Sequence, residues 1–335
     1  MDQSAAVTGR SQDEAIRRTL RLAQRCEALG YARFWVSEHH NSEAVAGTAP
    51  EILIAAIAAT TSRIRVGSAG VMLPHYAALK VAEQFRVLDA IAPGRIDLGV
   101  GRAPGSDGLT AHALNPNAAT AADRFPAQLR DLLAWTRDEP LPERHPFRAI
   151  HANPRGSGNP EVWVLGSSGY GAEVAAHFGL PYCFAHFITD GEGAAEAVRL
   201  YREQYQPSAA NPEPHAALCV WALACPTTAE AETQYASRAL WRLGRDRGDY
   251  RPLETPEAAL AEPYSELERI RMDRARARAV IGTGADVAAR LRELAAETGV
   301  AEIAVLTSTH DADVQMRSYE LLAEAWGQSM AVAAE

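Results

Sequence analysis

Apolar residues along the chain follow two alternating spacings. Residues 12–29 carry them at the helical period and stop at Gly30, whereas residues 33–37 form a short apolar run typical of a buried strand. The same alternation predicts further strands at 64–72, 96–101, 161–165, 182–188, 217–225 and 301–307, and further helices at 52–59, 77–91, 171–178, 191–206, 284–298 and 311–326. Because strands separated by single helices pair in parallel through right-handed crossovers, this order predicts an α/β fold.

The number of strands favours a (β/α)8 TIM barrel, and an open doubly wound sheet is the alternative. A chain of 335 residues is long enough for one such barrel, so we expect a single domain over residues 1–335. Two stretches interrupt the pattern. The proline-rich residues 138–160 predict a long loop. Residues 242–280, rich in Arg and Glu, predict an insertion before the seventh barrel helix, either a lid or a solvated helical excursion.

Charge and cysteine content narrow the class of protein. The chain has 33 Lys and Arg against 42 Asp and Glu, and a net charge of −9 argues against nucleic acid or an anionic membrane as the main partner. Its apolar runs are shorter than the ~20 residues that a membrane span needs, and residues 1–10 lack the features of a signal peptide. The 4 cysteines form no Cys-x-x-Cys pair, so we expect buried thiols in a cytoplasmic protein without a metal site.

Titratable residues directly follow the strand at 33–37. Glu38, His39 and His40 therefore lie at the carboxyl rim, where barrel enzymes carry their active sites. A carboxylate and two imidazoles at this rim are suited to acid–base catalysis, and a polar surface loop is the alternative. Zinc is disfavoured, because adjacent histidines lack the i, i+4 spacing of helical zinc ligands.

An arginine at the same rim indicates a binding site for an anion. The stretch 99–106 resembles a dinucleotide fingerprint, but Pro104 and Gly105 stand where the helix should continue. What remains is Arg102, whose planar fork suits a phosphate or a carboxylate, with a structural ion pair as the alternative.

The loop after the strand at 161–165 is the best phosphate site in the chain. It contains Ser167, Ser168, Gly169, Tyr170 and Gly171 just before a helix. Small residues let backbone N–H groups approach an anion, the hydroxyls add donors, and the helix N-terminus adds positive potential. The alternative is a tight strand-to-helix turn that requires glycine.

Small residues also end the strand at 64–72. Ala69 and Gly70 allow a flat ligand to lie close to the backbone there. Together these positions predict a phosphorylated planar cofactor over the barrel mouth, with its phosphate between Arg102 and the loop 166–171.

Several stretches together resemble the bacterial-luciferase-like, flavin-dependent monooxygenases. They are residues 30–40, 62–74, 82–85, 93–102, 164–168, 179–181 and 317–322. The resemblance implies a (β/α)8 barrel that takes reduced FMN from a separate, transiently bound flavin reductase. It also implies that the enzyme uses O2 to oxidise a small organic substrate and that it is a homodimer formed through helices of its N-terminal half.

The resemblance assigns roles to the rim residues. Glu38 resembles the carboxylate beside the flavin, and His39, with His40 next to it, the histidine needed for flavin oxidation. Ala69-Gly70 matches a non-prolyl cis peptide beneath the isoalloxazine ring. Arg102, Ser168 and the backbone of 169–171 match the phosphate ligands. Gly101 and Ser167 replace a cysteine and a glutamate of the light-emitting enzymes, which points to a relative of luciferase.

The first strand departs from the family pattern, because residues 1–4 match only its end. We expect either a short strand that completes the barrel or a start upstream of Met1. Two other functions stay open. One is hydride transfer with a deazaflavin coenzyme in the same superfamily, and the other is a non-catalytic partner subunit. The presence of Glu38, His39 and Arg102 argues against the latter.

Overall fold

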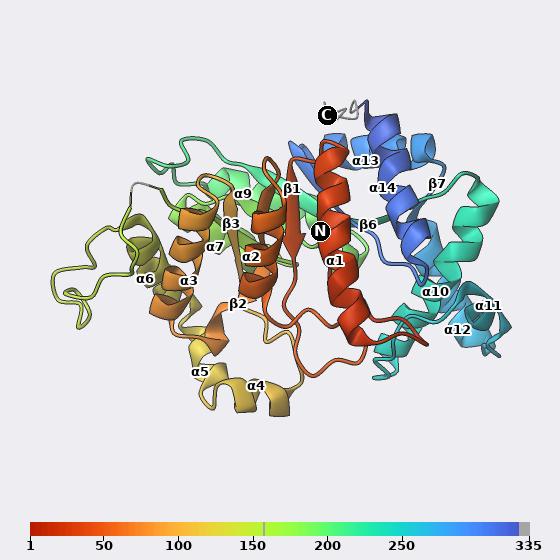
Figure 1. The fold of residues 1–335 in the computed structure, drawn as a ribbon, viewed down its shortest axis with the longest axis horizontal. Helices are drawn as coiled ribbons and strands as arrows, with labels where there is room; N and C mark the ends of the chain where they lie inside the picture. The colour runs from red at the N-terminus through yellow and green to blue at the C-terminus, as the bar shows by residue number, and fades with distance from the viewer. Residues whose placement is uncertain (157, 328–335) are drawn as a thin grey trace.

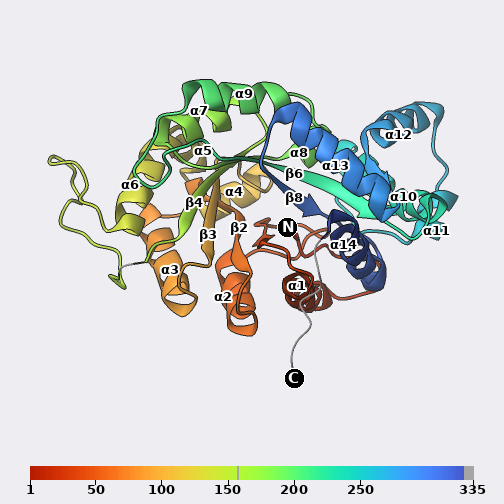
Figure 2. The same ribbon diagram turned by 90° about the horizontal axis from the view of Figure 1, so that it is seen from above.

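The computed structural model describes residues 1–156 and 158–327, and it forms the predicted parallel (β/α)8 architecture. The barrel strands are β1 (Arg33–Val36), β2 (Arg65–Met72), β3 (Ile96–Gly101), β4 (Glu161–Gly166), β5 (Tyr182–Phe184), β6 (Ala216–Ala224) and β8 (Glu302–Leu306). Figure 2 shows the helices arranged around the outside of the strands. They are α1 (Gln12–Ala28), α2 (Pro50–Thr60), α3 (Ala78–Ile91), α6 (Phe125–Arg137), α7 (Gly169–Phe178), α9 (Ala194–Gln204), α13 (Gly284–Thr298) and α14 (Ala312–Trp326).

The N-terminal backbone joins β1 to β8. The Met1 nitrogen donates to the Val305 carbonyl at 2.8 Å, and the Asp2 N–H donates to the Trp35 carbonyl at 2.8 Å. Ser37 N–H in turn donates to the Asp2 carbonyl at 3.1 Å. These residues occupy the place of the first barrel strand, so β1 is the second strand of the barrel. The prediction that residues 1–4 pair as a short strand is therefore confirmed.

Alternation along β6 separates two apolar layers. Ala217, Cys219, Trp221 and Leu223 point into the barrel, and the residues between them pack against the helices outside. Every residue of β6 is buried, as expected for a parallel strand covered on both faces. The four cysteines are free and buried, as predicted.

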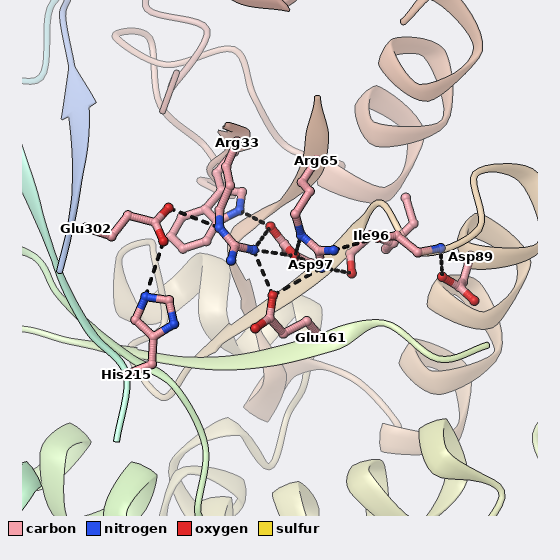
Figure 3. Close-up of polar contacts among 10 residues, drawn as sticks. Arg33, Arg65, Asp89, Ile96, Asp97, Glu161, His215 and Glu302 are labelled. Carbon is pink, nitrogen blue, oxygen red and sulfur yellow. Dashed lines mark hydrogen bonds and ion pairs between the residues drawn. The ribbon is translucent and has the colours of Figure 1, made fainter. Parts of the chain in front are cut away.

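A network of charges fills the amino end of the barrel (Figure 3). Asp97, which is fully buried, accepts hydrogen bonds from Arg33 at 2.9 Å, from Arg65 at 2.9 Å and from Trp35 Nε1 at 2.8 Å. Arg33 also pairs with Glu161 at 2.7 Å and with Glu302 at 3.0 Å. Because these groups lie opposite the carboxyl rim, we assign them to stability.

One strand prediction needs correction, and one strand was not predicted. The strand predicted at 182–188 ends at Phe184, and residues His186–Thr189 form the short helix α8. The prediction was wrong because Phe187 and Ile188 are apolar, as residues of a buried strand are, but their side chains line a cavity and do not belong to the sheet. A three-residue strand, β7 (Val280–Gly282), pairs with the end of β6 and was too short to detect by periodicity.

The insertion predicted near 242–280 lies between β6 and α13. It holds α11 (Pro256–Ala261) and α12 (Glu266–Arg278) and is preceded by α10 (Thr228–Asp246), which runs across its predicted start. These three helices gather at one side of the molecule (Figure 1). No helix within residues 1–156 and 158–327 has the length and apolarity to cross a membrane.

Candidate active site

A cavity of about 260 Å³ lies at the carboxyl rim of the barrel. Trp35, Cys183 and Cys219 line it from inside the barrel, and Met72 and Phe125 are among its apolar walls. Eight residues singled out in the sequence line it as well: His39, Ala69, Gly70, Arg102, Ser167, Ser168, Tyr170 and Gly171. Because parallel strands end at one rim, the fold brings together segments that are far apart in the chain.

The backbones of β2 and β3 approach closely beneath the cavity. A Cβ at Gly70 would lie 2.7 Å from the Gly99 carbonyl oxygen, and a Cβ at Gly99 would lie 2.1 Å from the Ser68 carbonyl oxygen. Both positions therefore require glycine. The register between the two strands shifts here, between Ser68 and Val71. The peptide bond between Ala69 and Gly70 is cis, as predicted from the resemblance.

Two hydrogen-bond donors, the Ser168 hydroxyl and the Arg102 guanidinium, lie at one edge of the cavity. Ser168 is the N-cap of α7, yet its side chain makes no capping hydrogen bond. The Arg102 guanidinium stacks on the Tyr170 ring, 4.1 Å from its centroid, and is exposed. No ion pair between Arg102 and a carboxylate is found in the part of the chain that the structure describes. A helix N-terminus with a free hydroxyl and an unpaired arginine is suited to a phosphate.

Glu38 lies behind the cavity wall and is buried. One of its carboxylate oxygens accepts from the Tyr76 hydroxyl at 2.8 Å and lies 2.8 Å from His40 Nε2, and the other accepts from Met72 N–H at 3.1 Å. With these contacts Glu38 fixes His40 and the end of β2. Neither Glu38 nor His40 is among the residues that line the cavity, and the same holds for Gly169.

His39 lines the cavity, and hydrogen bonds hold both its backbone and its ring. Its N–H donates to the Gly47 carbonyl at 2.9 Å, and its Nδ1 lies 3.2 Å from the Ser37 hydroxyl. Its Nε2 has no hydrogen-bond partner among the described residues. Burial lowers the pKa of His39, and the nearby Glu38 only partly opposes this effect. The imidazole is therefore neutral at pH 7 and can accept or donate a proton at the rim.

Some residues of this site were missed in the sequence. Tyr76 follows β2 after the short helical turn η1 (Leu73–His75), and its place just beyond a strand end was the signal that could have found it. Phe125 and Phe187 line the cavity from α6 and α8. Nothing in the local pattern distinguishes them from core residues.

Comparisons with known proteins agree with this architecture. A family model described as luciferase-like monooxygenase matches residues 2–302. The uncharacterized protein YwcH of Bacillus subtilis (strain 168) is 45% identical over 329 residues, which cover 97% of this chain and 98% of that protein. The N-acetyl-S-alkylcysteine monooxygenase of the same strain is 36% identical over 331 residues, which cover 97% of this chain and 96% of that protein.

Solved structures show the same fold. The crystal structure of apo-MsnO8 matches with a TM-score of 0.89 and 38% identity, covering 98% of this chain and 97% of its own. A more remote match is the oxygenating constituent of 3,6-diketocamphane monooxygenase from Pseudomonas putida, in complex with FMN. It has a TM-score of 0.69, is 18% identical and covers 100% of this chain and 98% of its own, and it bears on the fold alone.

Proposed function

Because the chain belongs to the luciferase-like monooxygenase family, we propose that it uses reduced FMN and O2 to oxidise a small organic substrate, with a separate flavin reductase as its source of reduced FMN. The observation that carries the proposal is the uncommitted anion site formed by Arg102 and the N-terminus of α7 at the edge of the rim cavity. A relative that is 36% identical acts on N-acetyl-S-alkylcysteine, so thioethers of this type are the first substrates to test.

The residues of the cavity fit FMN. Arg102, Ser168 and the first backbone N–H groups of α7 would hold the phosphate, and the glycine-lined surface at Ala69-Gly70 would leave room for a flat ring. Bound reduced FMN supplies the electrons that activate O2. The apolar walls exclude water from the ring, and His39 holds or moves a proton at Nε2.

Direct ligand titration tests the proposal. The purified protein is titrated with oxidised FMN, reduced FMN and the reduced deazaflavin coenzyme, and each complex is then exposed to O2. We expect the tightest binding for reduced FMN, followed by oxygen-dependent oxidation of a thioether. Preference for the deazaflavin, with no oxygen-dependent product, would favour the hydride-transfer alternative.

Replacing Arg102 with alanine should weaken the binding of FMN about tenfold or more, because a charge-assisted contact contributes roughly 1.5–3 kcal/mol. Riboflavin lacks the phosphate, so its affinity should stay the same. Fluorescence titration of both flavins measures the difference, and Arg17→Ala on the exposed face of α1 is the control. Equal losses for FMN and riboflavin would remove Arg102 from the phosphate site.

We propose a homodimer through α2 and α3. Both helices expose large apolar side chains, with Ile52 66%, Val87 46% and Ile91 53% exposed. Sedimentation velocity at micromolar concentration should show a dimer for the wild type and a monomer for the double variant Ile52→Asp, Ile91→Asp. Leu267→Asp on α12 should leave the dimer intact. A monomeric wild type would contradict this assembly.

A further inference from the structure

Gln3 lines the rim cavity from the first barrel strand, residues 1–4. Alternation along an extended segment decides the direction of its side chain. Met1 belongs to the apolar layer inside the barrel, where its sulfur lies 3.3 Å from that of Cys219. Asp2 points outward, and its carboxylate accepts from the Thr19 hydroxyl of α1 at 2.6 Å. Gln3 therefore points inward again, nearer to the carboxyl rim than Met1.

The Gln3 side chain is buried, yet its polar atoms reach the cavity. The residue is 7% exposed, and no hydrogen bond of its carboxamide is found among the described residues. Four residues keep an unpartnered polar atom sealed inside the fold, and Gln3 is not one of them. Its carboxamide therefore faces the open space of the cavity that it lines. Both its N–H groups and its carbonyl oxygen are available to a molecule in that space.

Gln3 lies beside His39 at one side of the cavity mouth. The backbone of Gly47 is next to both residues. Its carbonyl accepts from the His39 N–H at 2.9 Å, and a Cβ on Gly47 would lie 3.1 Å from the Gln3 carbonyl oxygen. The two side chains line the same cavity, so Gln3 is close to the imidazole that we propose to handle the proton.

The proposed phosphate site lies at the other side of the mouth. Residues 1–4 are the first of eight barrel strands and β4 is the fifth, so the two face each other across the closed barrel. Ser168 follows β4, and Arg102 follows the neighbouring strand β3. Gln3 is therefore separate from the phosphate ligands and stays available when they are occupied.

The rest of the cavity wall is uncharged. Arg102 is the one charged side chain in its described lining. His39 is neutral at pH 7 because its pKa is lowered, and burial raises the pKa of the Cys219 thiol to about 12. Once a phosphate neutralises Arg102, no charged side chain of this lining is left to pair with an ionic substrate. The cavity then favours neutral molecules, because moving an unpaired charge out of water is costly.

We propose that Gln3 binds an uncharged amide group of the substrate, whose apolar part extends along Trp35 and Cys183 inside the barrel. This inference rests on the proposed function, because it names the substrate class of the same cavity. The Gln3 carboxamide can donate to an amide carbonyl and accept from an amide N–H. A ketone offers an acceptor alone, and a carboxylate carries a charge that the cavity does not match. Among thioethers, neutral ones that carry an amide are therefore the favoured substrates.

Calorimetric titration in saturating oxidised FMN tests the proposal without turnover. The ligands are octanamide, its charged counterpart octanoate, and 2-nonanone, which has a methyl group in place of the amide nitrogen. The wild type should bind octanamide at least tenfold more tightly than octanoate. Gln3→Met keeps the length of the side chain and removes both hydrogen-bonding ends. It should lose at least tenfold in octanamide affinity and less than threefold in 2-nonanone affinity.

The same substitution elsewhere and a thermal measurement provide the controls. Gln24→Met, on the exposed face of α1, should change each affinity less than twofold. Octanamide should raise the Tm of the wild type and of Gln24→Met, and not that of Gln3→Met. Gln3→Leu, a second variant without the carboxamide, should lose octanamide affinity to the same degree. Equal affinities of the wild type for octanamide and octanoate, or unchanged octanamide affinity in the Gln3 variants, would overturn the proposal.

Flavin titrations distinguish this inference from the proposed function. Gln3→Met should bind FMN and riboflavin as tightly as the wild type does. Equal losses for the two flavins would place Gln3 against the flavin ring and overturn its role toward the substrate. If the wild type binds FMN but does not discriminate octanamide from octanoate, only the amide subsite fails. If it binds no flavin, the proposed function fails, and titrations of octanamide and 2-nonanone without FMN still report on Gln3.

Discussion

Replacing His39 with alanine should slow the oxidation of bound reduced FMN by O2 by about 100-fold or more, the scale of a positioned acid–base group. His39 lines the cavity, its Nε2 has no partner in the described residues, and its lowered pKa keeps the imidazole neutral at pH 7. Flavin absorbance under stopped flow measures the rate. Binding of reduced FMN should change little, because the proposed phosphate contacts lie elsewhere in the cavity.

A surface variant and a conservative variant complete this experiment. His177→Ala, on the exposed side of α7, should oxidise at the rate of the wild type. His39→Gln keeps a polar side chain that cannot take up a proton, so it should resemble His39→Ala. If His39→Ala oxidises as fast as the wild type, His39 has no part in the oxygen reaction.

Replacing Asp97 with alanine should lower the free energy of unfolding by about 3–5 kcal/mol, the usual cost of removing one partner of a buried ion pair. Asp97 is fully buried and accepts from Arg33, Arg65 and Trp35, all of which lose an acceptor in the variant. Urea unfolding followed by tryptophan fluorescence measures the change. The network lies at the amino end of the barrel, so FMN binding should be preserved in the folded variant.

An exposed ion pair provides the control for Asp97. Glu324 pairs with Arg317 at 3.3 Å on α14, and the two side chains are 60% and 47% exposed. Glu324→Ala should cost under about 1 kcal/mol, because water screens such pairs. Similar losses in the two variants would show that Asp97 contributes no more than a surface charge.

The sequence alone predicted most of the barrel, because hydrophobic periodicity is a local property. The strand predicted at 96–101 has the same ends in β3, and the run at 217–225 matches β6 to within one residue. The prediction of a strand at 182–188 was wrong because it, too, used only local information. An apolar segment that lines a cavity has the composition of a buried strand, and only the neighbours of Phe187 and Ile188 show the difference.

The sequence also determined which segments meet, since in a parallel barrel every residue just after a strand lies at one rim. From the sequence alone, that rule placed four residues together at the rim, namely His39, Gly70, Arg102 and Ser168. It did not determine which side chains face the cavity. Glu38 and His39 are adjacent, yet Glu38 turns behind the wall to Tyr76, and His39 faces the cavity. Only the tertiary structure decided this, because the direction of a side chain beyond the end of a strand depends on the partners packed around it.

Arg238 shows the same division most clearly. In the sequence it is one of several arginines on a helix, with no sign that it is buried. Its burial and its position against the Trp221 ring depend on β6 and α12 packing against α10. The sequence determined the charge of Arg238, and the tertiary structure determined which groups surround it, because the distances between segments are set only when folding brings them together.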